Sequence, residues 1–305
     1  RLLHVFLSAS VTDILLSPDG RFVREIACKL PSGRAARVSA RSFVLACGGI
    51  ENPRLLLNSC TQREGGVGNQ RGCVGRYFMD HVYFNFAAEL YLGARHVFPP
   101  GFYLSPYGIS NRGYWYLQLA PARQEERKTL NTALRFDVKQ IGQEPLPWGS
   151  EYGSDGARVV FSLTGELAPL RSNRISLSEK KDFLGLRKSI VDISVPESVK
   201  QDYSGLLRSF VRFTGRTGIG RIRIREGFSD LSGGSHHMGT TRMGDDPKSS
   251  VVDRDLKVHG LSNLYCAGSS VFPTSGCANP TWTIVALSLR LGEHLHQALR
   301  SQPAS

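Results

Sequence analysis

The sequence predicts a three-layer α/β domain whose chain is interrupted by an inserted α+β domain built on an antiparallel sheet. Two apolar runs end in glycine or other small residues, SFVLACGGI at 42–50 and NLYCAGSSV at 263–271, and such runs are typical of buried parallel strands. Between the two runs, apolar and polar residues alternate, which indicates antiparallel strands with one covered face. With 305 residues, of which 41% are hydrophobic and 21% charged, the chain is long enough to bury the cores of two domains.

The first predicted segment, residues 1–80, carries the first of the two buried strands. Its opening run, RLLHVFLSASVTDILLSPDG, predicts a strand that ends in the turn at 18–20. After the apolar run at 42–50, Asn52 is suited to cap a helix and Pro53 to occupy its first turn. A strand, a glycine turn and a helix start together indicate a parallel sheet, and ligands collect at the carboxyl ends of the strands in such sheets.

The second segment, residues 81–231, contains the alternating pattern of the predicted inserted domain. The pattern appears around 159–163, in NRISLS, and again at 191–195, whereas residues 123–157 are polar and rich in predicted loops. In RIRIREGF, residues 221–228, the isoleucines are expected to point inward and the arginines outward.

The formal net charge of +12 leaves a polyanion-binding site as an alternative interpretation of this arginine-rich strand. The basic residues are otherwise scattered along the chain, so we expect a solvated strand face and no nucleic-acid partner.

The third segment, residues 232–305, returns to the pattern of the first and is expected to complete the same domain. The apolar run at 263–271 is followed by a long amphipathic helix, because Ile284, Leu287, Leu291 and Leu295 recur at helical spacing.

Several classes of protein are disfavoured by what the sequence lacks. No apolar run approaches 18 residues, so no transmembrane segment is expected, and the polar residues near the N-terminus interrupt any signal-peptide core. The six cysteines have no metal-ligand spacing, and Cys47 and Cys266 fall in apolar runs, so we expect ordinary buried thiols.

Two stretches carry candidate chemistry. In SHHMGTTRMG, residues 235–244, two adjacent histidines occupy a loop of small residues, and a histidine in a cleft can serve as a general base. Asn279 precedes Pro280 at the start of the last helix, whose positive dipole end would point above the sheet. A structural histidine pair and plain helix capping remain the alternatives for these two stretches.

These stretches also carry a family resemblance. HHMGTTRMG together with VVDRDLKVHGLSNLYCAGSSVFPTSGCANPTWTIVALSLRLGEHL closely resembles the C-terminal signature of the glucose–methanol–choline (GMC) flavin oxidoreductases. Upstream, VLACGGIENPRLLLNS and VGRYFMDH are similar to middle segments of the family. The resemblance implies that the three-layer domain is of the FAD/NAD(P)-binding type and that the insertion binds substrate.

The resemblance also implies roles for particular residues. His236 takes the position of the catalytic base, Asn279 that of the group sharing the substrate oxygen, and His237 that of a neighbour. FAD is the implied cofactor, and the residues implied to contact it are Val11, Ala46, Gly48, Ala267, Gly268, Asn279, Pro280 and Thr281. The implied reaction oxidises the CH–OH group of an alcohol, sugar or polyol: hydride moves to flavin N5 while the base accepts the hydroxyl proton.

The chain departs from the family in one respect. No G-x-G-x-x-G turn for the pyrophosphate is found, and GRTGIGR at 215–221 has the wrong spacing and no preceding strand. We therefore expect an incomplete FAD-binding domain, either in a C-terminal fragment or in a chain whose N-terminal half is another polypeptide. An electron-acceptor protein is a further possible partner, and a non-catalytic binding module or a lyase-type relative remain alternatives.

Overall fold

The computed structural model describes residues 3–92, 116–140, 157–225 and 227–301. The chain divides into two compact units: unit 1 comprises 1–80, 168–194 and 236–305, and unit 2 comprises 81–167 and 195–235. Residues 144–156 and 302–305, expected to be a loop and a frayed end, lie outside the described residues.

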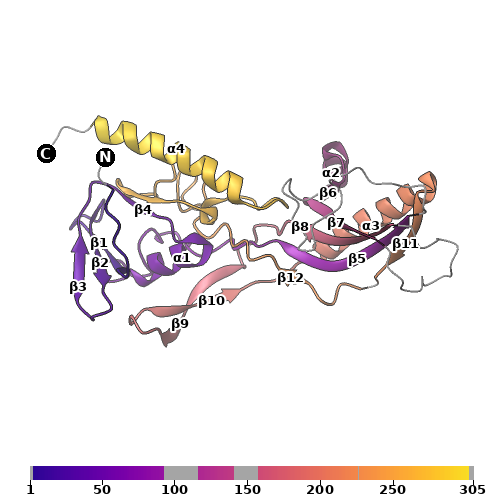
Figure 1. Ribbon diagram of the computed structural model, residues 1–305. Helices are drawn as coiled ribbons and strands as arrows, with labels where there is room; N and C mark the ends of the chain where they lie inside the picture. Colours follow the sequence, from indigo (N-terminus) through magenta and orange to yellow (C-terminus); the bar gives the residue numbers. More distant parts are fainter. Residues whose placement is uncertain (1–2, 93–115, 141–156, 226, 302–305) are drawn as a thin grey trace. The chain divides into compact units, whose positions relative to one another are not determined.

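Unit 1 is organised around two short parallel strands, β4 (Phe43–Leu45) and β13 (Leu264–Cys266). Helices α1 (Gly48–Asn58) and α4 (Thr281–Arg300) lie on opposite sides of this pair (Figure 1). The apolar face predicted for the last helix is confirmed: Leu291 is buried in the unit 1 core, and Ile284, Leu287 and Leu295 pack against that core. The strands and both helices thus share one apolar core.

A separate antiparallel sheet in unit 1 is formed by β1 (Ser10–Leu16), β2 (Val23–Lys29) and β3 (Ala35–Val38). The predicted strand and turn at the start of the chain are confirmed, since the backbone N–H of Gly20 donates to the carbonyl of Ser17 at 2.8 Å. Gly20 has a φ of 70°, which a glycine adopts without strain.

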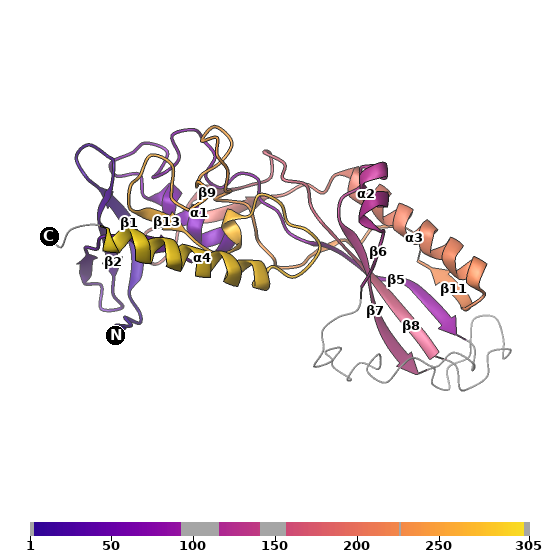
Figure 2. The ribbon, with the colours of Figure 1, turned by 90° about the horizontal axis from the view of Figure 1, so that it is seen from above.

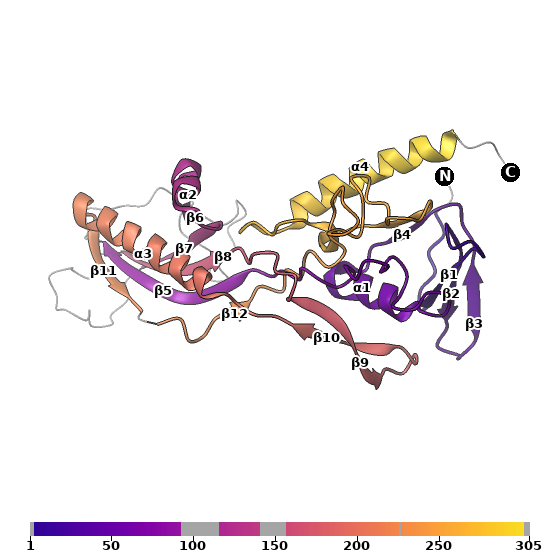
Figure 3. The same ribbon diagram turned by 180° about the vertical axis from the view of Figure 1, so that it is seen from behind.

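The hairpin of β9 (Arg174–Lys181) and β10 (Arg187–Asp192) differs from the predicted domain order. It was expected within the inserted segment 81–231, but it belongs to unit 1 and packs against α1 (Figure 3). The reason is a set of side-chain bonds: Arg54 of α1 donates to Asp182 at 2.5 Å and to the carbonyl of Arg187 at 2.9 Å. Residues 232–235, expected in the third segment, belong to unit 2.

Unit 2 is a six-stranded antiparallel sheet in which β11, β5, β8, β7 and β6 are neighbours in that order and β12 also pairs with β5. Helices α2 (Pro121–Arg127) and α3 (Glu197–Thr217) complete the unit (Figure 2). The strands are β5 (Val82–Leu92), β6 (Tyr116–Gln118), β7 (Thr132–Gln140), β8 (Ala157–Gly165), β11 (Gly220–Ile224) and β12 (Ser232–Gly233).

The antiparallel strand predicted at 159–163 is confirmed, and Val159, Phe161 and Leu163 of β8 are buried in the unit 2 core. The expectation of a single covered face was wrong, because Val160 on the other face is only 5% exposed. The expectation of loops at 123–157 was wrong for residues 123–127, which belong to α2, and for residues 132–140, which form β7 along the whole length of β8. β7 is held in place by its backbone hydrogen bonds to the buried strand β8. The polar residues of β7 gave no sign of this pairing in the sequence. In β11, Ile222 packs against the core as expected, whereas Ile224 is 37% exposed.

Candidate functional site

The carboxyl ends of β4 and β13 bring four of the predicted site residues together. The backbone N–H of Ala267 donates to the carbonyl of Leu45 at 2.8 Å, so Ala46 and Ala267 follow neighbouring strands. Next come Gly48 and Gly268, with φ values of 84° and 92°, and a methyl group at either α-carbon would meet no atom within 4 Å. The backbone at these two glycines is therefore open to close approach by a flat ligand.

Helix α1 begins earlier than the sequence predicted. Cys47, not Asn52, is the N-cap residue, and the Cys47 side chain is exposed rather than buried as expected. Asn52 is fully buried inside the helix, where its Oδ1 accepts the N–H of Cys47 at 2.8 Å and its Nδ2 donates to the carbonyl of Ala267 and to Ser270 Oγ. Asn52 therefore ties the start of α1 to the end of β13.

Pro53 lies in the interior of α1, two positions beyond the first turn in which it was expected. Proline has no N–H, so the carbonyl of Gly49 loses its usual donor four residues on. The buried hydroxyl of Thr240 supplies a donor instead, at 2.6 Å from the Gly49 oxygen. A methyl group on Gly49 would overlap the carbonyl of His237, so this glycine is needed for the approach of the histidine loop.

The histidine loop itself is held on two sides. Met238 and Met79 exchange backbone hydrogen bonds of 2.9 and 3.0 Å, which fix the loop to the segment before β5. Ser269 directly follows Gly268, and its hydroxyl donates to the carbonyl of His237 at 2.7 Å. The backbone carbonyl of Ser269 accepts the N–H of Gly239 at 3.2 Å. The loop is thus anchored beside the carboxyl end of β13.

His236 is half-buried, and its backbone N–H donates to Asp80 Oδ1 at 2.8 Å. Burial lowers the pKa of the His236 imidazole below its usual value; the Asp80 carboxylate opposes that shift, and His237 adds to it. A lowered pKa keeps the imidazole neutral near pH 7, the form that can accept a proton. Asp80 was not singled out from the sequence, although it immediately precedes His81 in the RYFMDH motif.

The second histidine of the pair has different surroundings. The His237 ring lies 5.7 Å from the ring of Phe78, tilted by 30°, and its carbonyl is bonded to Ser269. The expected place of His237 as a neighbour of the base stays a prediction.

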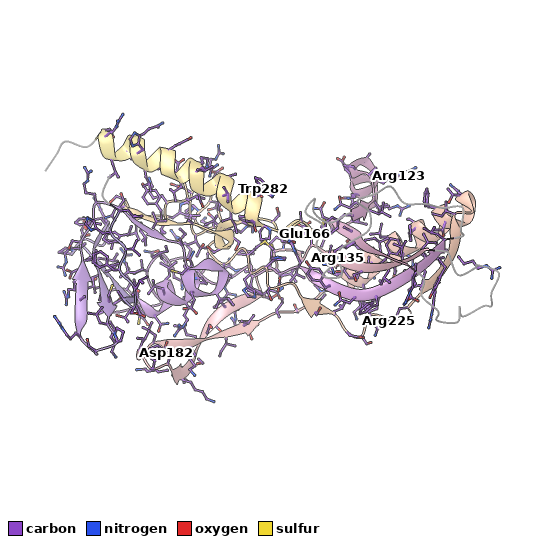
Figure 4. All side chains as sticks on the ribbon, viewed as in Figure 1. Arg123, Arg135, Glu166, Asp182, Arg225 and Trp282 are labelled. Atoms are coloured by element: carbon purple, nitrogen blue, oxygen red, sulfur yellow. The ribbon has the colours of Figure 1, made fainter. Side chains whose placement is uncertain are left out.

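The start of α4 leaves its first turn accessible. Pro280 is buried and occupies the N-cap, whereas Asn279 and Thr281 are exposed. Among the described residues no side chain caps this turn, and Trp282, 86% exposed, projects from it (Figure 4). The backbone N–H groups of this turn can therefore donate hydrogen bonds to an anionic or strongly polar ligand group.

Two predicted relations are not established by the contacts. Val11 lies in β1, where it pairs with Cys28, and β1 contacts the far end of α1, since Ile14 N–H donates to Ser59 Oγ at 3.1 Å. The contact of Val11 with a cofactor therefore stays a prediction. Asn279 and His236 both belong to unit 1, and their meeting over one ligand stays a prediction.

The remaining candidates have structural roles. Asp253 is a turn residue, since its Oδ1 accepts the N–H groups of Asp255 and Lys257. Burial raises the pKa of the Cys266 thiol to about 12, so this cysteine is the inert buried thiol that was expected. In the parts of the chain that the structure describes, no cluster of metal-ligating residues and no helix able to span a membrane is found.

The chain is similar to known proteins in sequence and in fold. Residues 222–288 match the family model described as GMC oxidoreductase. The chain is 30% identical over 283 residues to the fructose dehydrogenase large subunit of Gluconobacter japonicus, covering 88% of this chain and 50% of that one. It is 30% identical to paromamine 6'-oxidase of Streptomyces fradiae, with 90% and 48% covered.

Among solved structures, pyridoxine 4-oxidase from Mesorbium loti is similar with a TM-score of 0.62 at 19% identity, covering 95% of this chain and 57% of that one. That likeness shows that this chain shares its fold with part of that enzyme. The chain belongs to the GMC oxidoreductase family, as the motifs indicated. It spans about half the length of the curated relatives it matches.

Proposed function

We propose that this chain is part of an FAD-dependent oxidoreductase that oxidises the CH–OH group of an alcohol, sugar or polyol. The observation that carries the proposal is the anchoring of the His236 loop, through Ser269, beside the open glycines that follow β4 and β13. Relatives named as a fructose dehydrogenase and a paromamine 6'-oxidase support this substrate class. In this proposal unit 1 contributes to the FAD-binding domain, and unit 2 is the substrate-binding domain.

The residues present fit a flavin. Gly48 and Gly268 leave open space where side chains would otherwise project, and the uncapped first turn of α4 offers N–H groups to a polar ring edge. In our proposal Ala46, Gly48, Ala267, Gly268 and the backbone at 279–281 hold the cofactor. When bound, FAD supplies the acceptor for the hydride that leaves the substrate carbon.

His236 is the base of this proposal. Its imidazole is held neutral near pH 7 by burial, so it can take the hydroxyl proton as the C–H bond breaks. The hydrogen bond from the backbone N–H of His236 to Asp80 Oδ1 fixes the backbone at this position. The imidazole ring therefore has fewer orientations to adopt before it reaches the reactive one. Asn279 is proposed to orient the same substrate oxygen with its carboxamide.

The test measures flavin binding and flavin reduction separately. The chain is combined with an N-terminal half that carries a pyrophosphate-binding turn, loaded with FAD, and mixed anaerobically with fructose, other sugars or alcohols. The proposal expects the flavin absorbance to bleach, and expects His236→Ala to lose the bleaching by about 100-fold or more while it still retains flavin. His296→Ala, an exposed histidine on α4, is the matched control and should bleach like the parent.

Two outcomes would contradict the proposal. If the flavin bleaches as fast in His236→Ala as in the parent, His236 is not the catalytic base. Flavin that binds but is reduced by none of the sugars and alcohols would favour the lyase-type alternative.

A further inference from the structure

Unit 2 contains a cavity that the proposed oxidation does not use. It has a volume of about 200 Å³ and lies between α2, α3 and the segment that leads into β7. This volume corresponds to roughly six or seven water molecules, so a ligand of a few non-hydrogen atoms would fit. The walls include Leu119, Leu130 and Leu206, which give one side an apolar character.

A carboxylate on α3 lines this cavity, and none of the ion pairs found among the described residues involves it. Asp202 lines the cavity and accepts one hydrogen bond, from the backbone N–H of Leu130 at 3.2 Å. In the described part of the chain it forms no ion pair, and burial raises the pKa of its carboxyl while the Leu130 N–H opposes that rise. A half-buried carboxylate with unused acceptor capacity favours a ligand that brings positive charge and hydrogen-bond donors.

Two further oxygen atoms belong to residues of the same cavity. The hydroxyl of Thr129 is buried and has no hydrogen-bond partner among the residues that the structure describes. Gln124 Nε2 donates to the carbonyl of Leu119 at 2.8 Å, and its Oε1 remains available as an acceptor. Buried polar atoms without partners are few in native proteins, and the Thr129 hydroxyl therefore has unused acceptor capacity beside the cavity.

We propose that the cavity lined by Asp202, Thr129 and Gln124 binds the primary ammonium group of a small organic amine. An ammonium group has three donors and no acceptor, which matches one carboxylate and two neutral oxygens. The short carbon body of the amine would then contact Leu119, Leu130 and Leu206. This site is separate from the residues proposed for flavin chemistry, and the inference does not depend on the proposed function.

The mouth of the cavity suggests two sources of such an amine. Arg127 and Arg208 also line the cavity, and both are exposed. One N–H group of Arg127 donates to Ser209 Oγ at 3.3 Å. Their remaining donors suit a carboxylate on the same ligand, as in an amino acid. A simple alkylamine lacks that carboxylate, so the two sources can be told apart by affinity.

The experiment titrates the chain with n-propylammonium, with 3-aminopropanoate and with 1-propanol, followed by calorimetry and by amide chemical shifts. The proposal expects saturable binding of n-propylammonium, with 1-propanol at least about tenfold weaker because it lacks the charge and two of the donors. Tighter binding of 3-aminopropanoate identifies amino acids as the source, whereas equal or weaker binding identifies simple amines.

Asp202→Asn keeps an oxygen for the Leu130 N–H and removes the charge, so it should weaken n-propylammonium at least about tenfold. Asp230→Asn removes an exposed charge in the same unit and serves as the matched control, with affinity unchanged. Thr129→Val, expected to weaken binding about threefold, gives a second variant if the melting temperature of Asp202→Asn is lowered.

Three results would overturn the proposal. One is n-propylammonium binding no more tightly than 1-propanol, which would mean that the cavity holds only water or apolar groups. A second is unchanged n-propylammonium affinity in a folded Asp202→Asn variant. A third is a change in amide chemical shifts that avoids Thr129, Leu130 and Asp202.

Discussion

The bond between Thr240 and α1 leads to a prediction whose magnitude follows from the structure. Pro53 deprives the Gly49 carbonyl of its helical donor, and the fully buried Thr240 hydroxyl replaces that donor at 2.6 Å. Thr240→Val removes the hydroxyl with little change of shape and leaves the carbonyl without this donor. A buried polar group that loses its partner costs about 1–3 kcal/mol, so we expect the free energy of unfolding to fall by about 2 kcal/mol.

A double-mutant cycle tests the cause as well as the magnitude. Pro53→Ala restores an N–H four residues after Gly49, so the carbonyl regains a donor within the helix. Thr240→Val should therefore cost about 1 kcal/mol less in the Pro53→Ala background than in the parent. The measurement is urea unfolding of the four variants, followed by circular dichroism. Thr217→Val, which removes a hydroxyl at the exposed end of α3, is the control and should cost under about 0.5 kcal/mol.

The reasoning would be refuted by a specific pattern of results. If Thr240→Val costs as much in the Pro53→Ala background as in the parent, the hydroxyl does not act through the carbonyl that proline leaves free. A cost below about 0.5 kcal/mol in the parent would show that the buried carbonyl finds another donor.

Three further predictions concern an ion pair, a glycine and a histidine. Arg54→Met leaves Asp182 without its partner in a pair whose side chains are only 12% and 15% exposed, so urea unfolding should show a loss of about 3 kcal/mol. Gly268→Ala should cost about 1–3 kcal/mol in the same assay, because φ 92° and ψ −171° form a conformation that almost only glycine adopts. For His236→Gln the measurement is the free energy of unfolding as a function of pH. Because the pKa of His236 is lowered in the folded state, the folded parent binds fewer protons than the unfolded parent as the pH falls. The parent should therefore lose more stability than the variant between about pH 7.5 and about pH 5.5.

Each of these predictions has a matched control. Arg174→Met breaks a pair whose side chains are 45% and 48% exposed, and a loss as large as that of Arg54→Met would contradict the role given to burial. Gly205→Ala, in the interior of α3 with open space around it, should raise stability by about 0.5–1 kcal/mol, opposite in sign to Gly268→Ala. His296→Gln, at an exposed position, should follow the parent from pH 7.5 to 5.5 as measured in the same buffers at about 0.1 M salt. An equal pH response of His236→Gln and the parent would contradict the effect of burial on His236.

The sequence alone determined the features that depend on local pattern. The apolar run that became β13 reflects burial on both faces of a strand, whereas β4 buries Phe43 and Leu45 but leaves Val44 42% exposed. The helical spacing of Leu287 and Leu291 reflects one covered face of α4. The motif around His236 was equally readable, because a loop of small residues beside two histidines is rare enough to carry a family resemblance.

Tertiary structure alone decided which partners those residues meet. Nothing local marks Asp80 as the acceptor for His236 or Thr240 as the donor for Gly49, since each pair is separated by more than 150 positions. The β9–β10 hairpin joins unit 1 for the same reason: Arg54 finds Asp182 only after the chain has folded. The periodicity of the sequence predicts which face of a helix or strand is covered. Long-range hydrogen bonds and ion pairs determine which other element covers it.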